Sequence, residues 1–307
     1  MNHNEPRRVA LVTAVYPGVE PFLADWYRSV TAQDDGGADL WIACDGLDPA
    51  RVADACGAEP RAHWVRASPG DTPAQVRQRV LERVVERYDA AVLVDSDDVL
   101  HPSRVAAARR RLASNDLSAC ALRLVDEHGH DLGAELTLPG GMTPDAVLPR
   151  ANLFGLSNSA YRCAALRACL PIPAAARAVD WFLATRTWLA GGRLDVDTTP
   201  RMKYRRHGAN MTSVRPPFTA DTVRRDTALV VAHLALLAAA PGVHPDPARH
   251  AAVTAMADDL DAFARHVVGA EERLAQYVAR LAETPTPSLW WAHVAHPALR
   301  PMWRDDG

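Results

Sequence analysis

Short apolar runs alternate with segments of helical spacing over the first 112 residues. Residues 8–15 are almost continuously apolar and end at Tyr-Pro-Gly, which predicts a strand covered on both faces, as in a parallel sheet. Residues 20–32 carry apolar side chains at helical spacing. Further strands are expected at 39–44, 63–67 and 90–95, and further helices at 73–88 and from 102 to about 112. This alternation predicts a doubly wound α/β sheet.

The pattern is more mixed between residues 119 and 214. The expected elements are strands at 119–125 and 134–138, an irregular segment at 152–162, a helix at 178–192 and two short strands at 193–197 and 201–206. Two glycines, Gly191 and Gly192, are expected to end the helix. This half should supply the second wall of a binding site.

An alanine-rich helical region follows Arg215. A first helix is expected over 216–242, and a second one carries apolar residues at seven-residue spacing: Val253, Leu260, Val267, Leu274 and Leu281. Apolar residues at this spacing line one side of a helix, as in a coiled coil. We expect this side to pack against 219–239 in an intramolecular hairpin. The alternative is self-association into a homo-oligomer. The Trp- and Pro-rich tail, 287–303, is expected to pack on the body.

Composition excludes several classes of protein. The net charge of −3 gives no general attraction to nucleic acid or anionic lipid. The five cysteines form no close CxxC pair, so reduced, buried thiols are expected rather than zinc or disulfides. The start of the chain is interpreted as a strand rather than a signal peptide. The most apolar stretch, 228–242, is short for a transmembrane segment and contains His233, so we expect a soluble, cytoplasmic protein without a transmembrane segment.

Candidate chemistry lies where predicted strands end. Residues 90–102 read AAVLVDSDDVLHP, so an apolar strand runs into three carboxylates, which repel one another unless a cation or a very polar ligand lies before them. Polar residues also follow the first two strands, at 13–16 and 45–46. Ligands of open α/β sheets bind at that edge, and hard cations such as Mg²⁺ or Mn²⁺ prefer oxygen ligands. The alternative is a loop whose carboxylates cap the next helix, although a cap needs only one Asp.

Two familiar phosphate-binding motifs are absent from the sequence. No GxGxxG follows the first strand, and no GxxxxGK[ST] is present. A dinucleotide-binding Rossmann site and a P-loop are therefore excluded. Bound phosphates would have to be held by metal and basic side chains.

Six segments, taken together and in order, resemble the inverting nucleotide-sugar glycosyltransferases of family 2, which have the GT-A fold. They are VTAVYPGVEPFLADWYRSVTAQ (12–33), CDG (44–46), GDTPAQVRQR (70–79), VLVDSDDVLHPSRV (92–105), VDWFLATR (179–186) and YRRHGANMT (204–212). The resemblance covers roughly residues 8–214. It implies an α/β, GT-A-like, Rossmann-type sheet with a mixed acceptor half and a C-terminal helical extension.

The resemblance also implies a division into domains and an activity. Residues 1–214 would form the catalytic domain, with a nucleotide-binding half at about 1–118 and an acceptor half at 119–214, and 215–307 would be the helical region. The expected reaction is metal-dependent inverting transfer of a sugar from a nucleotide diphosphate-sugar to an acceptor that stays unidentified. UDP is the expected nucleotide, with TDP or GDP as alternatives, and the cofactor would be Mn²⁺ or Mg²⁺.

Individual positions carry over from the family's motifs. Tyr16 and Asp45 would hold the base, and Asp95 would approach the ribose. Asp97 and His207 would bind the metal. The implied nucleotide-binding positions as a whole are Thr13, Ala14, Tyr16, Asp45, Arg77, Asp95 and Ser96.

The acceptor side is implied in the same way. Asp180 would be the general base, since inverting transfer needs a base within hydrogen-bond reach of the acceptor hydroxyl. Trp181, Asn158 and Arg205 would face the donor sugar or the acceptor.

The sequence departs from the family pattern at Val179, where an acid usually precedes the base, and at Cys44 and Gln78. Alternatives therefore stay open. The protein could be a nucleotidyltransferase, or a nucleotide- or glycan-binding protein of the same fold without activity. Asp180 could be a solvated helix-start residue, Arg77 a surface residue and His207 an exposed loop residue.

Overall fold

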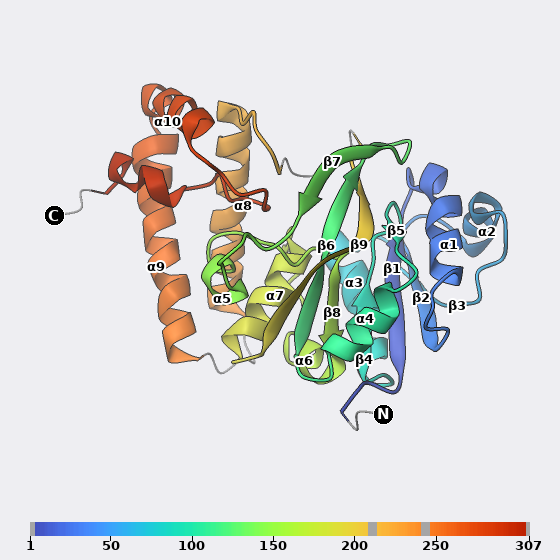
Figure 1. The fold of residues 1–307 in the computed structure, drawn as a ribbon. Coiled ribbons are helices and arrows are strands. Elements are labelled where there is room, and N and C mark those ends of the chain that lie inside the picture. The colour runs from blue at the N-terminus through green and yellow to red at the C-terminus, as the bar shows by residue number, and fades with distance from the viewer. Residues whose placement is uncertain (1–3, 208–213, 241–245, 305–307) are drawn as a thin grey trace.

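The computed structural model describes residues 4–207, 214–240 and 246–304, and the end of the last motif, 208–212, lies outside them. Among the described residues, nine strands form one mixed sheet in the order β3-β2-β1-β4-β8-β6-β9-β5, with β7 paired to β6 (Figure 1). The α/β prediction is confirmed, and helices follow the sheet at the C-terminal end.

The parallel half of the sheet contains the four strands expected from the apolar runs. They are β1 (Val9–Val15), β2 (Ala38–Cys44), β3 (Ala62–Arg66) and β4 (Ala90–Leu93). Every residue of β1 is buried because β1 lies between β2 and β4 and is covered on both faces. The carboxyl ends of β1, β2 and β4 therefore meet at one edge of the sheet.

The helices of this half alternate with its strands along the chain. They are η1 (Glu20–Phe22), α1 (Leu23–Thr31), α2 (Pro49–Cys56), α3 (Pro73–Val85) and α4 (Arg104–Arg111). Thr72 and Gln75 form a capping box around Pro73 at the start of α3. The sequence analysis missed α2, which is capped by Asp48 and ends at Gly57 in the left-handed region, φ +69°.

The mixed half differs from expectation in two of its strands, and it has short elements that were not predicted. It contains β5 (Val99–Leu100), β6 (Leu117–Val125), β7 (Asp131–Leu136), β8 (Ser159–Arg162), β9 (Leu194–Arg205) and the short helices α5 (Pro144–Val147) and α6 (Cys163–Ala168). The segment expected to be irregular ends in β8, which pairs antiparallel with both β4 and β6. The two short strands expected near residue 200 are one strand, β9, whose register against β6 shifts where Pro200 interrupts the ladder.

The helix α7 (Val179–Leu189) is almost completely buried. Every residue of α7 except Asp180 is buried, which means that the helix is covered on all sides. The next helices, α8 (Ala220–Ala239) and α9 (Pro247–Phe263), both contact α7 and lie beyond it from the strands (Figure 1). The C-terminal helices therefore complete the core that the sheet begins.

The heptad does not form one continuous helix. It is divided among α9, the π-helical turn η2 (Ala264–Val268) and α10 (Glu271–Glu283). The break comes at Gly269, where a Cβ would lie 2.8 Å from the Arg265 carbonyl oxygen. All five heptad residues are nevertheless buried, and α9, η2 and α10 all contact α8. The hairpin prediction is confirmed in this interrupted form, and association into homo-oligomers stays a prediction.

The tail packs on the body, as expected. Residues Asn152 and Trp290 form an isolated antiparallel bridge, and the last turn, η3 (Pro297–Met302), lies near α10. Buried Asp259 on α9 accepts hydrogen bonds from Arg300 Nε at 3.0 Å and from Trp303 Nε1 at 3.2 Å. One carboxylate thus fastens the end of the tail to α9.

Two further expectations concern the whole chain. All five cysteines lie within the described residues, and each is buried and unpaired, as expected for reduced thiols. No helix in the described ranges combines the length and the apolar character that crossing a membrane would require.

Replacing Asp259 with Ala should lower the free energy of unfolding by about 1–3 kcal/mol, because the buried indole N–H and the guanidinium group of Arg300 lose an acceptor. Denaturant unfolding measures the change. Asp258→Ala is the matched control, since Asp258 is exposed one residue earlier on the same helix. Equal effects of the two substitutions would contradict the role of Asp259 as an anchor.

Candidate active site

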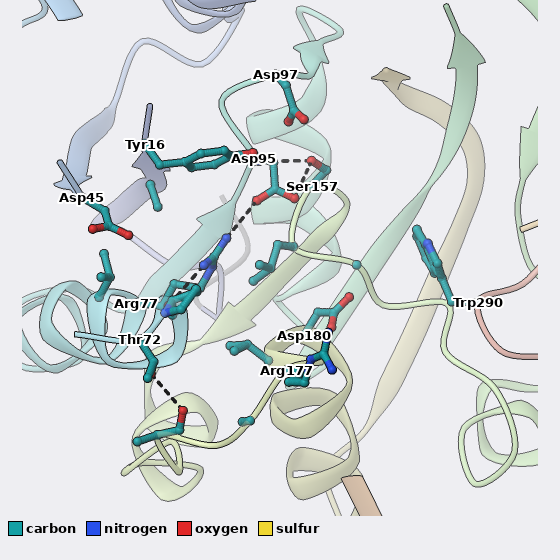
Figure 2. Close-up of a pocket in the computed structure, with 18 of the residues that line it drawn as sticks. Tyr16, Asp45, Thr72, Arg77, Asp95, Asp97, Ser157, Arg177, Asp180 and Trp290 are labelled. Carbon is teal, nitrogen blue, oxygen red and sulfur yellow. Dashed lines mark hydrogen bonds and ion pairs between the residues drawn. The ribbon is translucent and has the colours of Figure 1, made fainter. Parts of the chain in front are cut away.

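A cavity of about 710 Å³ opens at the edge of the sheet where β1, β2 and β4 end. Figure 2 shows Tyr16 and Asp45 on one side of it and Asp180 and Trp290 on the other, with Arg77 and Asp95 between them. The chain therefore brings residues from three strand ends, the first turns of α3 and α7, and the tail to one space. The lining residues are Ala14, Tyr16, Asp45, Thr72, Pro73, Val76, Arg77, Asp95, Asp97, Gly155, Leu156, Ser157, Ala174, Ala175, Ala176, Arg177, Val179, Asp180, Tyr204, His207, Trp290 and Trp291.

The three carboxylates after β4 have three different environments. Asp95 and Asp97 line the cavity, whereas Asp98 is fully buried. Asp98 accepts hydrogen bonds from the Ser157 hydroxyl and from the Arg205 backbone N–H, the latter at 2.7 Å. Burial, together with Asp97 and Asp95, raises the pKa of Asp98 well above its usual range. Asp98 thus links the loop before β8 to β9, and the other two carboxylates face the cavity.

Asp95 is poised between a cation and other carboxylates. Its Oδ1 lies 3.6 Å from the Arg77 guanidinium, and its backbone N–H donates to Ser157 Oγ at 3.1 Å. Burial raises the pKa of Asp95 to about 7, Arg77 opposes this, and the charges of Asp97 and Asp180 add to it. The negative charge at this edge is therefore only partly compensated by the protein.

Asp97 and His207 form the best candidate for a metal site. Asp97 Oδ2 lies 2.9 Å from His207 Nε2, and the imidazole stacks on Phe22 with ring centroids 5.1 Å apart. A carboxylate oxygen and an imidazole nitrogen suit Mn²⁺, and a carboxylate oxygen suits Mg²⁺. Within the described residues, no group of three or more His, Cys, Asp and Glu side chains is placed to hold a metal ion. The remaining ligands would therefore have to be oxygens of a bound molecule or water, which fits a site for a metal–phosphate complex.

Asp180 lies in the first turn of α7, apart from the Asp97–His207 pair. Its Oδ2 accepts a hydrogen bond from Asn152 Nδ2 at 3.1 Å, and its Oδ1 accepts one from the Trp181 backbone N–H at 2.8 Å. Burial raises the pKa of Asp180 to about 6, and the Trp181 N–H, Arg77 and Asn152 oppose the rise. Such a carboxylate is ionised at neutral pH, yet it is basic enough to accept a proton.

Several of the residues expected to bind the nucleotide line the cavity. Ala14, Tyr16, Asp45 and Arg77 line the cavity. Tyr16 is 39% exposed, which is unusual for an aromatic side chain at a strand end, so its ring is available for stacking. Burial and the charges of Asp97 and Asp95 raise the Tyr16 pKa, and the phenol therefore stays protonated.

Two residues of the expected nucleotide-binding group do not line the cavity. Thr13 is buried within β1, and Ser96 is buried with its hydroxyl donating to the Ala14 carbonyl at 2.8 Å. Ser96 therefore supports the cavity wall and makes no direct contact with the cavity.

The residues expected on the sugar side are not in the cavity lining either. Trp181 is fully buried and stacks between His233 and Trp291, at centroid distances of 4.2 and 4.8 Å. Buried Asn158 donates to the carbonyls of Cys120 and Leu153, at 2.8 and 3.0 Å. The Trp181 ring and the Asn158 amide nitrogen already have their partners inside the protein, so these two residues belong to the core.

Arg205 is the third of these residues, and it is also buried. Its Nε donates to the Asp97 carbonyl oxygen and its Nη1 to the Glu127 carbonyl oxygen, both at 2.8 Å. It therefore fixes the backbone that carries Asp97, and it does not reach the cavity.

Several residues that line the cavity were not predicted from the sequence. Ser157 and Arg177 lie in irregular segments, and Thr72 was not singled out although it caps α3 and donates to the Ala174 carbonyl at 2.9 Å. Trp290 and Trp291 lie in a tail that was interpreted only as packing. The adjacent Trp pair was a usable signal, because two tryptophans in a segment that packs on the sheet side can line a cavity as well as fill the core.

Solved structures with the same fold include proteins in complex with nucleotide sugars. The mannosyltransferase PcManGT from Pyrobaculum calidifontis, in complex with GDP-Man and Mn²⁺, is 16% identical with a TM-score of 0.59, and the match covers 99% of this chain and 82% of that one. TarS 1–349 from S. aureus, in complex with UDP-GlcNAc, is 14% identical with a TM-score of 0.55, over 96% and 85% of the two chains. The chain has the fold of these proteins.

At the level of sequence alone, no protein-family model matches the chain. No curated protein matches it either. The similarity is therefore one of fold.

Replacing Asp95 with Asn should stabilise the protein at alkaline pH. A carboxyl whose pKa is raised to about 7 on folding costs stability as the pH rises from about 4 to 7, because the unfolded chain ionises first. We expect a gain in the free energy of unfolding of about 1 kcal/mol at pH 8, because partial exposure reduces the full effect, and a smaller gain towards pH 4.

Urea unfolding at pH 4.5, 6 and 8 in EDTA measures this gain. Asp258→Asn provides the same charge change at an exposed position. A pH-independent effect of Asp95→Asn, or a loss of stability at pH 8, would contradict the proposed cost of this charge.

Proposed function

We propose that the protein is a metal-dependent inverting glycosyltransferase that moves a sugar from a nucleotide diphosphate-sugar to an acceptor. One observation carries the proposal. A single cavity is lined by half-buried Asp180, whose pKa is raised to about 6. Arg77 and the Asp97–His207 pair, which would bind the diphosphate and a metal ion, line the same cavity apart from Asp180. The same fold in proteins complexed with GDP-Man and Mn²⁺ or with UDP-GlcNAc supports this proposal.

The donor would bind along the edge of the parallel strands. The base would stack on the exposed ring of Tyr16, with Asp45 as a hydrogen-bond acceptor. The diphosphate would lie between the guanidinium group of Arg77 and the Asp97–His207 pair. UDP is the expected nucleotide. GDP or TDP would make the same contacts, with the base on the Tyr16 ring and the phosphates near Arg77 and the Asp97–His207 pair.

Asp97 and His207 would hold a divalent cation, Mn²⁺ or Mg²⁺. When bound, that cation supplies positive charge that stabilises the leaving diphosphate. It would also compensate the negative charge that the protein itself leaves near Asp95.

Asp180 would be the general base on the acceptor side. Its carboxylate takes the proton from the acceptor hydroxyl as the oxygen attacks the anomeric carbon of the sugar. One carbon–oxygen bond forms while the bond from that carbon to the diphosphate breaks, and the electron pair of the broken bond leaves with the diphosphate. Attack from the face opposite to the leaving group inverts the anomeric configuration.

The remaining assignments belong to this proposal. Residues 1–214 would form the catalytic domain of a family 2 enzyme, and 215–307 the helical region. The acceptor would enter between Arg177 and Trp290, which line the cavity on the Asp180 side (Figure 2).

Replacing Asp180 with Asn should abolish transfer but preserve nucleotide binding. The loss in kcat should reach about 10²–10⁴-fold, the usual contribution of a positioned base. In the unmodified protein, kcat should fall as the pH decreases through about 6, because protonated Asp180 cannot accept a proton. Steady-state kinetics from pH 5 to 8 measure this, and full activity of Asp180→Asn would remove Asp180 from the mechanism. An inactive binding protein would bind nucleotide and show no transfer in either form.

Nucleotide binding should depend on a divalent cation. Calorimetric titration with UDP, GDP and TDP, each with and without Mn²⁺, should show one nucleotide bound more tightly with the metal. Asp97→Asn should remove the metal-dependent part of the affinity, and Asp258→Asn should not. No binding of any of the three nucleotides in the presence of Mn²⁺ would contradict the proposed donor site.

A further inference from the structure

Asn152 lies beside the cavity, where it contacts the carboxylate of Asp180. It is fully buried in the segment between α5 and β8, and it does not line the cavity. Its Nδ2 donates to Asp180 Oδ2 at 3.1 Å. Val179, the residue before Asp180, is buried and has no polar side chain to hold the carboxylate. The side-chain hydrogen bond to Asp180 comes instead from Asn152, 28 positions earlier in the chain.

The orientation of the Asn152 amide is determined by a second hydrogen bond. Its Oδ1 accepts from the Phe154 backbone N–H at 2.9 Å. Because a backbone N–H can only donate, the oxygen must face Phe154 and the NH₂ group must face Asp180. Asn152 therefore presents a donor to the base, and it cannot flip without losing both bonds.

The backbone of Asn152 is held by the C-terminal tail. Its N–H donates to the Trp290 carbonyl at 3.0 Å, and its carbonyl accepts from the Trp290 N–H at 3.1 Å. The Trp290 ring lies against Gly155, where a Cβ would approach the ring to 2.9 Å, and packs edge-on against Tyr204. The two backbone bonds leave Asn152 little freedom to move relative to the tail.

We propose that Asn152 is the positioning residue for Asp180 and that the tail, through Trp290, holds it in place. This inference rests on the proposed role of Asp180 as the base. Asn152 fixes the direction of one carboxylate oxygen, and the Trp181 N–H fixes the other. The C-terminal tail is then part of the catalytic apparatus, because it supports the residue that aims the base.

The charge environment of Asp180 makes this hydrogen bond measurable. Arg77 on α3 favours the ionised carboxylate, whereas burial opposes it. The Asp95 carboxyl after β4 and the Tyr161 hydroxyl on β8 also interact with Asp180. Loss of a donor from Asn152 should therefore raise the pKa of Asp180.

Asn152→Ala is the sharpest test, because it removes the donor to Asp180 and introduces no titratable group. The Asp180 carboxyl should titrate at least about one pH unit higher, the size expected for one hydrogen bond to an ion. The value of kcat should fall about 10–100-fold near pH 6.5. Asn152→Leu, which keeps a side chain of similar size, should shift the titration in the same direction.

The titration is followed by ¹³C NMR of aspartate carboxyl groups without substrate, with the Asp180 signal identified by its loss in Asp180→Asn. Asn158→Ala is the matched control, since Asn158 is a buried amide of the same segment that does not touch Asp180. The control should leave the Asp180 titration in place even where stability falls.

An unchanged Asp180 titration in folded Asn152→Ala and Asn152→Leu would overturn the proposal, and so would an equal shift in Asn158→Ala. The pH profile of kcat should move with the NMR titration, and a profile that stays in place would exclude a positioning role. The NMR measurement does not depend on catalysis. If Asp180 shifts as expected but the unmodified protein transfers sugar from no donor, it is the proposed function that fails.

Discussion

The structure depends on one electrostatic constraint, the concentration of carboxylates at the edge of the parallel sheet. Asp95, Asp97 and Asp98 follow a buried strand within four residues, and mutual repulsion at such distances is costly in a partly buried space. The fold separates them: Asp98 points inward to Ser157 and Arg205, Asp95 faces Arg77, and Asp97 pairs with His207. The negative charge that these contacts do not compensate can be compensated by a ligand. The edge is therefore suited to a cation and a diphosphate.

The second wall depends on the C-terminal region. α7 is buried on all sides because α8 and α9 cover the face that the sheet does not. The stack of His233, Trp181 and Trp291 runs from α8 through α7 to the tail, and burial lowers the pKa of His233 to about 3, so its imidazole stays neutral inside this stack. The helices after residue 214 thus support the first turn of α7, where Asp180 lies.

Local sequence patterns predicted the elements that local physics governs. The apolar runs identified β1, β2, β3 and β4, since a strand covered on both faces is apolar throughout. The helical spacing of apolar residues from Pro73 onwards predicted α3. The patterns failed where distant pairing decides, since β8 forms because β4 and β6 offer it partners on both sides. The heptad is interrupted at Gly269, and its three parts, α9, η2 and α10, all contact α8.

The sequence by itself determined where the chemistry lies along the chain, because strand ends, carboxylate clusters and helix caps are properties of neighbouring residues. Asp95 and Asp97 were candidates from their place after a strand and Asp180 from the family resemblance, and all three line one cavity. Only the tertiary structure decided which side chains face that cavity, because burial depends on what packs from elsewhere. Trp181, Asn158 and Arg205 turned inward, whereas Trp290 reached the cavity from a tail more than a hundred residues beyond Asp180. Asn152 was invisible to sequence reasoning because its hydrogen bond to Asp180 spans 28 positions and two elements.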